Sequence, residues 1–264
     1  MNSLFFSRIP AMDTGTLAKI IQYIQNSYQP PEKTDYGGGF QFAAMINVEQ
    51  KYCSGPFDNN FLDGENSATV KEQLNKVSLY QGQKLVVAVP MNKGQGGKAV
   101  HSERVLLMCG DNNQAVTPVK NLLNKIKDGC SVFYTYNSPC MQFCLNQQRD
   151  EDERKREQAL KERNEKNRLK GKKIVPIEPA VKKCIVDSLD ILTNYRGLKA
   201  FVFSRVYDND IGNTEDEKKR KVALLAAALK TVAEKVPLYK CSGTSCVNCL
   251  SGGEIVSQCL SNNP

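Results

Sequence analysis

Four stretches of the chain carry the dense apolar pattern of β-strands. They lie at 40–48, 84–90, 130–136 and 200–207. Residues 84–90 (Lys-Leu-Val-Val-Ala-Val-Pro) are almost continuously apolar, which is typical of a strand covered on both faces. This segment therefore predicts a central strand, and 130–136 predicts a second strand rich in β-branched and aromatic residues.

Helical patterns separate these strands. They cover 13–26, 118–128, 181–193 and 214–235, and a further helix is expected to start near His101. Thr214 and Glu217 fit a capping box at the start of the last helix. Because strands and helices alternate, the sequence predicts an α/β fold with three layers, α/β/α, around one mixed central sheet of about five strands.

The distribution of charge and cysteine divides the chain into parts. We expect one domain over 1–240, with a charged insertion at 148–175 and a cysteine-rich C-terminal tail at 241–264. Acidic and basic residues are mixed throughout the insertion, which predicts a solvated helix or a disordered segment. A nucleic-acid-binding arm is the functional alternative for this segment.

Composition bears on partners and compartment. The chain has 36 Lys and Arg against 28 Asp and Glu, a net charge of +8, which favours polyanionic partners or serves solubility alone. No stretch approaches the roughly 20 apolar residues that cross a bilayer, and the N-terminus lacks a standard secretory pattern. We therefore expect an intracellular protein, cytoplasmic or nuclear, with no membrane partner. In a reducing compartment the ten cysteines favour metal ligands over disulfides.

The chain has a single histidine, His101, and Glu103 follows it by two residues. Cys140 and Cys144 come shortly after the strand at 130–136. One imidazole and two thiolates supply the three protein ligands of a catalytic zinc site, which keeps its fourth position for water. Spacing by four residues would place both thiols on one face of a helix near its N-terminus, where thiolates are favoured. The alternatives are a surface or helix-capping histidine and two buried cysteines that behave as small apolar residues.

The motifs His101-x-Glu103 and Pro139-Cys140-x-x-x-Cys144 resemble the signature of the zinc-dependent cytidine deaminase superfamily. The chain is similar to AID/APOBEC-like and bacterial-toxin-type deaminases over roughly residues 13–235. This resemblance implies one zinc ion held by His101, Cys140 and Cys144, with Glu103 as the group that moves protons.

The resemblance also implies that Asn92 contacts the sugar of the substrate. Three features depart from the family pattern. Ser102 stands in the first motif where Ala or Val is usual, three residues separate the cysteines where two are commoner, and Asn137 stands where AID/APOBEC proteins carry tryptophan. Tyr136 and Ser138, beside the second motif, are further candidates for substrate contact, although Tyr136 suits the sheet core equally well.

Four cysteines of the tail are spaced for a second metal site, with disulfides or reducible thiols as the alternative: Cys241, Cys246, Cys249 and Cys259. The function expected from all these features is hydrolytic deamination of cytosine, in single-stranded DNA or RNA or in free cytidine or deoxycytidine. The main alternative is a catalytically inactive deaminase fold that binds nucleic acid or a protein partner. A cysteine-rich interaction protein with a chance motif is the third.

Overall fold

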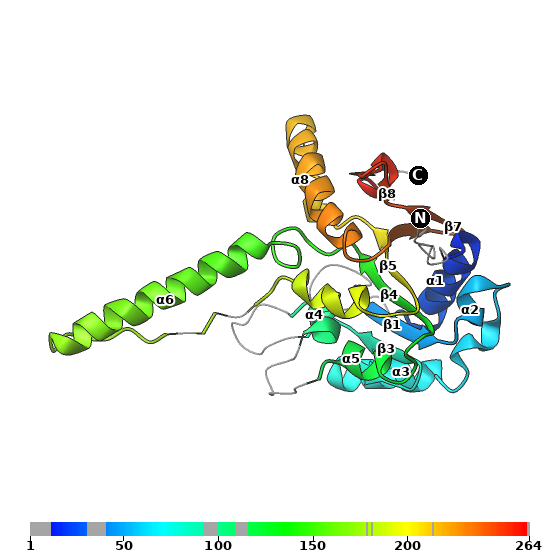
Figure 1. The fold of residues 1–264 in the computed structure, drawn as a ribbon, viewed down its shortest axis with the longest axis horizontal. Coiled ribbons are helices and arrows are strands. Elements are labelled where there is room, and N and C mark those ends of the chain that lie inside the picture. Colours follow the sequence, from blue (N-terminus) through cyan, green and yellow to red (C-terminus); the bar gives the residue numbers. More distant parts are fainter. Residues whose placement is uncertain are drawn as a thin grey trace, which may run out of the picture.

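A computed structural model describes residues 12–30, 41–91, 100–108, 116–177, 179–180, 182–212 and 214–262. A central sheet lies between helices on both faces, and one long helix leaves this body on its own (Figure 1). Among the described residues, no helix combines the length and the apolar character needed to span a membrane.

The central sheet has seven strands. They are β1 (Ala43–Val48), β2 (Leu79–Gln81), β3 (Leu85–Ala88), β4 (Cys130–Asn137), β5 (Leu198–Arg205), β6 (Leu238–Ser242) and β7 (Ser245–Asn248). Their order is β2-β3-β1-β4-β5-β6-β7, with β4–β5 and β5–β6 parallel and the other neighbours antiparallel. The predicted α/β class with a mixed sheet is confirmed, but the sheet is larger than the expected five strands.

One face of the sheet is covered by N-terminal elements. They are α1 (Thr14–Tyr28), α2 (Lys51–Ser54), the 3-10 helix η1 (Asn59–Leu62) and α3 (Ser67–Val77). Helix α1 begins where the Asp13 carboxylate accepts a hydrogen bond from the Thr16 N–H at 2.7 Å. Its apolar stripe, Leu17, Ile20, Ile21 and Ile24, is buried against the strands.

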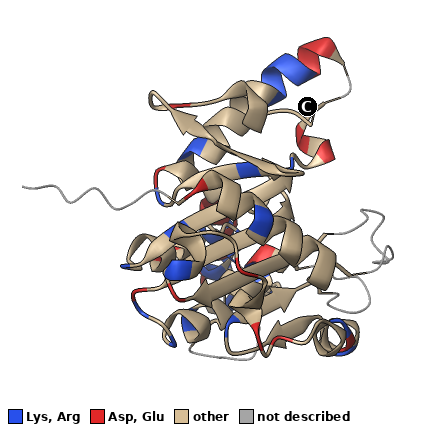
Figure 2. Ribbon diagram, turned by 90° about the vertical axis from the view of Figure 1, so that its right-hand side faces the viewer, with Lys and Arg blue, Asp and Glu red and all other residues tan. Residues whose placement is uncertain are grey.

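The opposite face holds a second apolar core. It is covered by α4 (Ser102–Leu107), α5 (Pro118–Leu123), η2 (Asp187–Leu189), α7 (Asp190–Thr193), η3 (Asp208–Asp210) and α8 (Glu215–Ala233). The Thr214 side chain accepts a hydrogen bond from the Glu217 N–H at 3.2 Å, as the capping box predicts. Figure 2 shows that the charged residues of α8 gather in its first turns.

The helix predicted over 181–193 is wrong for its first half. Helical structure begins only at η2, and the described residues 182–186 before it form no regular element. The Asp150 carboxylate accepts the N–H groups of Lys183 and Cys184, and the Cys144 carbonyl accepts the Ile185 N–H at 2.8 Å. These backbone donors are therefore committed to partners outside the segment, which prevents a regular helix.

The charged insertion forms α6 (Gln147–Leu169), a solvated helix with no buried residue, as one of the two predicted forms. It projects from the body, and the chain then returns along it (Figure 1). Asn164 accepts the Val175 N–H at 2.9 Å, and Glu157 accepts the Ala180 N–H at 2.6 Å. Helix and return segment together form an arm.

Six cysteines of the described part of the chain form disulfides: Cys53–Cys130, Cys241–Cys246 and Cys249–Cys259. The last two pairs use all four thiols of the suggested second metal site, so that suggestion is wrong and its disulfide alternative is correct. The expected boundary at residue 240 falls inside β6. Beyond the sheet, β8 (Leu250–Ser251) and β9 (Glu254–Ile255) form a small hairpin, followed by η4 (Ser257–Cys259).

Candidate active site

His101 and Glu103 lie at the start of α4, on the face opposite α1. His101 is the N-cap residue of the helix, and Glu103 lies in its first turn. The helix begins close to β3, because Met91 and Val100 form an isolated bridge that brings the chain back from the strand end. His101 is partly exposed, whereas the Glu103 side chain is buried at 2% exposure.

Cys140 and Cys144 lie on a tight turn after β4, where the sequence predicted a helix. The Leu145 N–H donates to the Cys140 carbonyl at 3.1 Å, which closes the turn around both cysteines. Outside partners stabilise it: the buried Asp210 carboxylate accepts the Met141 N–H at 3.0 Å. The turn therefore brings the two thiols together without the helix that the sequence predicted.

The structure brings the three predicted ligands together. The Sγ atoms of Cys140 and Cys144 lie 3.6 Å and 3.3 Å from His101 Nδ1. All three ligand atoms lie within 4.8 Å of one another, and among the described residues they form the one such group of His, Cys, Asp or Glu. Two thiolates and an imidazole are a donor set that suits zinc, and three protein ligands leave one coordination position for water or substrate.

The electrostatics of the two cysteines agree with a cation site. A hydrogen bond with Cys144 lowers the pKa of the Cys140 thiol to about 4, and His101 acts in the same direction. The same hydrogen bond and burial raise the pKa of the Cys144 thiol well above its ordinary value. The pair alone therefore carries one thiolate readily, and a second thiolate requires a neighbouring positive charge. A bound metal ion would supply that charge.

Glu103 is held by polar side chains beside the His–Cys group. Its Oε1 atom lies 2.9 Å from Thr135 Oγ1 and accepts a hydrogen bond from Gln41 Nε2 at 3.1 Å. The Ser102 hydroxyl lies 3.3 Å from its other oxygen. Burial raises the pKa of the Glu103 carboxyl, while His101 and the Thr135 hydrogen bond oppose that rise. This carboxyl is therefore fixed in place and able to hold a proton.

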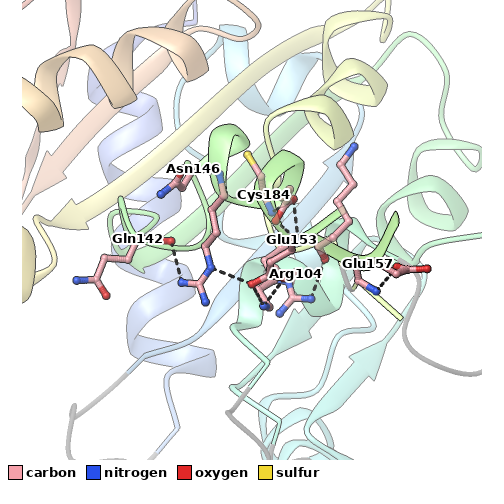
Figure 3. Close-up of polar contacts among 11 residues, drawn as sticks. Arg104, Gln142, Asn146, Glu153, Glu157 and Cys184 are labelled. Atoms are coloured by element: carbon pink, nitrogen blue, oxygen red, sulfur yellow. Dashed lines mark hydrogen bonds and ion pairs between the residues drawn. The ribbon is translucent and has the colours of Figure 1, made fainter. Parts of the chain in front are cut away.

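A polar network connects the cysteine turn to the base of α6 (Figure 3). Arg149 donates to the Gln142 carbonyl and pairs with Glu153, which also pairs with Lys183 at 2.7 Å. The Arg149 guanidinium lies 4.1 Å above the Phe143 ring, whose centroid is 5.9 Å from that of His101. The root of the arm is thus part of the scaffold around the candidate site.

Two of the predicted substrate contacts are not brought into the His–Cys group, and the third lies outside the described residues. Tyr136 packs with the core on the α1 face, opposite Cys140 and Cys144, because alternate residues of β4 point to opposite faces. Ser138 is buried, and its hydroxyl accepts the Tyr207 N–H at 3.0 Å. Asn92 is the one outside the described part of the chain.

Sequence reasoning missed Gln41, Thr135, Tyr207 and Asp210. Thr135 had a usable signal, because it follows Phe133 by two residues on β4. Both side chains therefore lie on the face of the strand that holds the cysteines. Gln41 gave no local signal. Burial raises the pKa of the Tyr207 phenol, and the hydrogen bond with Asn209 opposes that rise. The nearby Cys140 also raises this pKa, so Tyr207 lies close to the site. Asp210 ends η3, in a polar segment after β5 where an acidic residue gives no particular signal.

The chain matches the model of one known protein family. The model of the family described as Secreted Novel AID/APOBEC-like Deaminase 1 matches residues 14–168 and 177–263. No curated protein and no solved structure matches the chain.

The family description overturns one expectation from the sequence. The family is described as secreted, so the expected intracellular location, cytoplasmic or nuclear, is wrong. Three disulfides agree with an oxidising environment. The resemblance read from the His–Glu and Pro–Cys motifs is confirmed, since the match spans both. The chain belongs to this secreted family of AID/APOBEC-like deaminases.

Proposed function

We propose that the chain is a zinc-dependent hydrolase that deaminates cytosine. The observation that carries this proposal is the position of the buried Glu103 carboxyl beside three clustered ligand atoms, to which it does not itself belong. A purely structural zinc site has no need of a buried carboxyl that is not a ligand. The fixed carboxyl thus favours an enzyme over an inactive deaminase fold.

His101, Cys140 and Cys144 would hold the ion. When bound, zinc supplies Lewis-acid chemistry and lowers the pKa of a water molecule to about 7. Glu103 accepts one proton from the attacking water and delivers it to the ring nitrogen, and it then transfers the second proton of that oxygen to the departing amine. The bond from water oxygen to the amino-bearing ring carbon forms, the carbon–nitrogen bond breaks, and ammonia leaves. Thr135 and Gln41 orient the carboxyl through these transfers.

The proposed substrates are cytosine in single-stranded DNA or RNA and free cytidine or deoxycytidine. The net charge of +8 favours the polynucleotides, because their phosphates attract a basic protein. For a secreted protein, the relevant substrate lies outside the cell or in the secretory pathway.

The test begins with the metal content of the purified full chain, measured by elemental analysis. Uracil or uridine formation is then followed on single-stranded DNA, RNA, cytidine and deoxycytidine. Glu103→Gln should retain zinc and lose activity, because the amide cannot accept the proton. Glu72→Gln, at an exposed carboxyl on α3, is the matched control and should behave as the parent.

The outcomes separate the proposals made from the sequence. Zinc without turnover on any of the four substrates would favour the inactive deaminase fold that binds nucleic acid or a protein. A chain purified without zinc that also fails to take it up would contradict the assigned ligands. Full activity in Glu103→Gln would remove the proton-transfer role.

A further inference from the structure

The arm built on α6 has an end unlike its base. We call residues 166–175 the arm tip, which comprises the last turn of α6 and the start of the return segment. Figure 1 shows that α6 points away from the sheet, so its far end is distant from the candidate site. The two matched blocks of the family model leave out 169–176.

The arm tip is uniformly basic. Its cations are Lys166, Arg168, Lys170, Lys172 and Lys173, and it contains no acidic residue. The first turns of α6 differ, because four consecutive acidic residues occupy 150–153. Arg168 pairs with Glu165 at 2.8 Å, but both side chains are largely exposed and the pair holds little of its charge. Residues 147–165 carry six basic and seven acidic side chains, so the net positive charge of the arm lies at its end.

The same ten residues present aliphatic side chains to water. Leu169 is 78% exposed, Ile174 55% and Val175 44%, whereas the described remainder of α6 has no exposed large apolar residue. Exposed apolar side chains gathered at one place are a feature of interaction surfaces rather than of ordinary solvated helices. Cations and aliphatic groups therefore share one surface.

Hydrogen bonds fix the shape of this surface. The Asn164 side-chain amide donates to the Val175 carbonyl at 2.6 Å and accepts the Val175 N–H at 2.9 Å. The Lys172 N–H donates to the Asn167 carbonyl at 2.8 Å, and Gly171 adopts a positive φ of 63° that allows the reversal. The aliphatic side chains are thus directed outward by a folded turn.

We propose that the arm tip docks on the surface of an anionic lipid bilayer. Basic side chains meet the negative headgroups, and short aliphatic side chains enter the boundary between headgroups and acyl chains. A nucleic acid strand fits less well, because the tip has no aromatic residue on which a base could stack. A sulfated polysaccharide would use the cations but would leave the three aliphatic side chains in water. This peripheral docking needs no spanning helix and does not depend on the deaminase activity.

Vesicle co-sedimentation of the full chain tests the proposal. The vesicles are phosphatidylcholine alone, or phosphatidylcholine mixed with phosphatidylserine. One variant removes tip charge and one removes tip apolar surface: Lys170→Ser with Lys172→Ser and Lys173→Ser, and Leu169→Ser with Ile174→Ser and Val175→Ser. Matched controls change exposed residues elsewhere: Lys127→Ser with Lys219→Ser and Arg220→Ser, and Val77→Ser with Val222→Ser and Leu224→Ser.

The parent and both controls should bind the mixed vesicles, and added salt should weaken that binding. Removal of three tip lysines should reduce binding about a hundredfold, given ~1 kcal/mol for each basic residue near an anionic surface. Removal of the three aliphatic residues should also weaken it, with less sensitivity to salt.

Three results would overturn the proposal. The first is a parent chain that does not bind mixed vesicles. The second is binding that both tip variants retain in full. The third is retention on heparin or single-stranded DNA that the lysine variant loses and the aliphatic variant keeps, without vesicle binding by the parent. Every substituted tip residue is exposed, so we expect the melting temperatures of the tip variants to equal that of the parent. Equal melting temperatures would exclude misfolding as the cause of weaker binding.

Discussion

Thr135→Val is the substitution that most directly tests how the Glu103 carboxyl is held. The change replaces a hydroxyl with a methyl group of similar size at a fully buried position on β4. Thr135 Oγ1 lies 2.9 Å from Glu103 Oε1 and 2.9 Å from the Asn137 carbonyl oxygen, and it accepts a hydrogen bond from Gln41 Nε2 at 3.1 Å. One hydroxyl therefore links the carboxyl to the end of the strand and to Gln41.

The expected loss follows from the strength of this contact. A hydrogen bond to a charged group contributes about 1.5–3 kcal/mol, and each ~1.4 kcal/mol of lost transition-state stabilisation lowers the rate tenfold. We therefore expect kcat to fall by about ten- to hundredfold. KM should change little, because Thr135 is fully buried and contacts the Glu103 carboxyl rather than an incoming substrate. Zinc content should not change, since Thr135 is not among the clustered ligands.

The assay is steady-state deamination on the substrate with the highest parent activity, together with elemental analysis and thermal unfolding. Thr135→Ser keeps the hydroxyl and should recover most of kcat, which separates the hydrogen bond from side-chain packing. Two results would refute the reasoning: a kcat in Thr135→Val equal to that of the parent, or equal losses in the Ser and Val variants.

Three further predictions concern the scaffold of the site. Cys140→Ser should lose zinc and lower the melting temperature, and unchanged metal content by elemental analysis would count against this ligand. Asp210→Ala removes the carboxylate that caps the cysteine turn and should weaken zinc affinity by about ten- to hundredfold in a competition titration with a chelator, whereas the exposed Asp208→Ala should not. Replacing Cys53 and Cys130 with Ser should cost about 2–5 kcal/mol of unfolding free energy in urea, because their disulfide closes a loop of sequence separation 77. Equal urea midpoints for parent and double variant would contradict that value.

The elements that could be predicted from the sequence are those with strong local patterns. Helix α1 has an N-cap and a regular apolar stripe, β3 is continuously apolar, and α8 begins with a capping box. Strands β6 and β7 were missed because both are short and contain Cys and Ser, and β7 is mostly exposed. Local composition does not reveal that such a segment completes a sheet whose other strands lie far away in sequence.

The sequence pointed to the candidate ligands and to Glu103, but it did not reveal the side chains that hold these residues in place. A single histidine and a Pro–Cys motif are rare enough to be noticed in one sequence. Gln41 contributes only because β1 pairs with β4, which places residues almost a hundred positions apart side by side. The expected location was wrong, although the unusual number of cysteines, six of which form disulfides among the described residues, already favoured an oxidising compartment.

The sulfur chemistry of this chain places a condition on its maturation. Six cysteines are joined in pairs, while Cys140 and Cys144 remain thiols close to each other and to His101. An oxidant that produces the first outcome also threatens the second, because neighbouring thiols are good partners for exchange. At the proposed zinc site, metal capture and oxidation would therefore compete for the same two sulfurs during biosynthesis. A disulfide formed between them before the ion binds would remove two of the three proposed ligands.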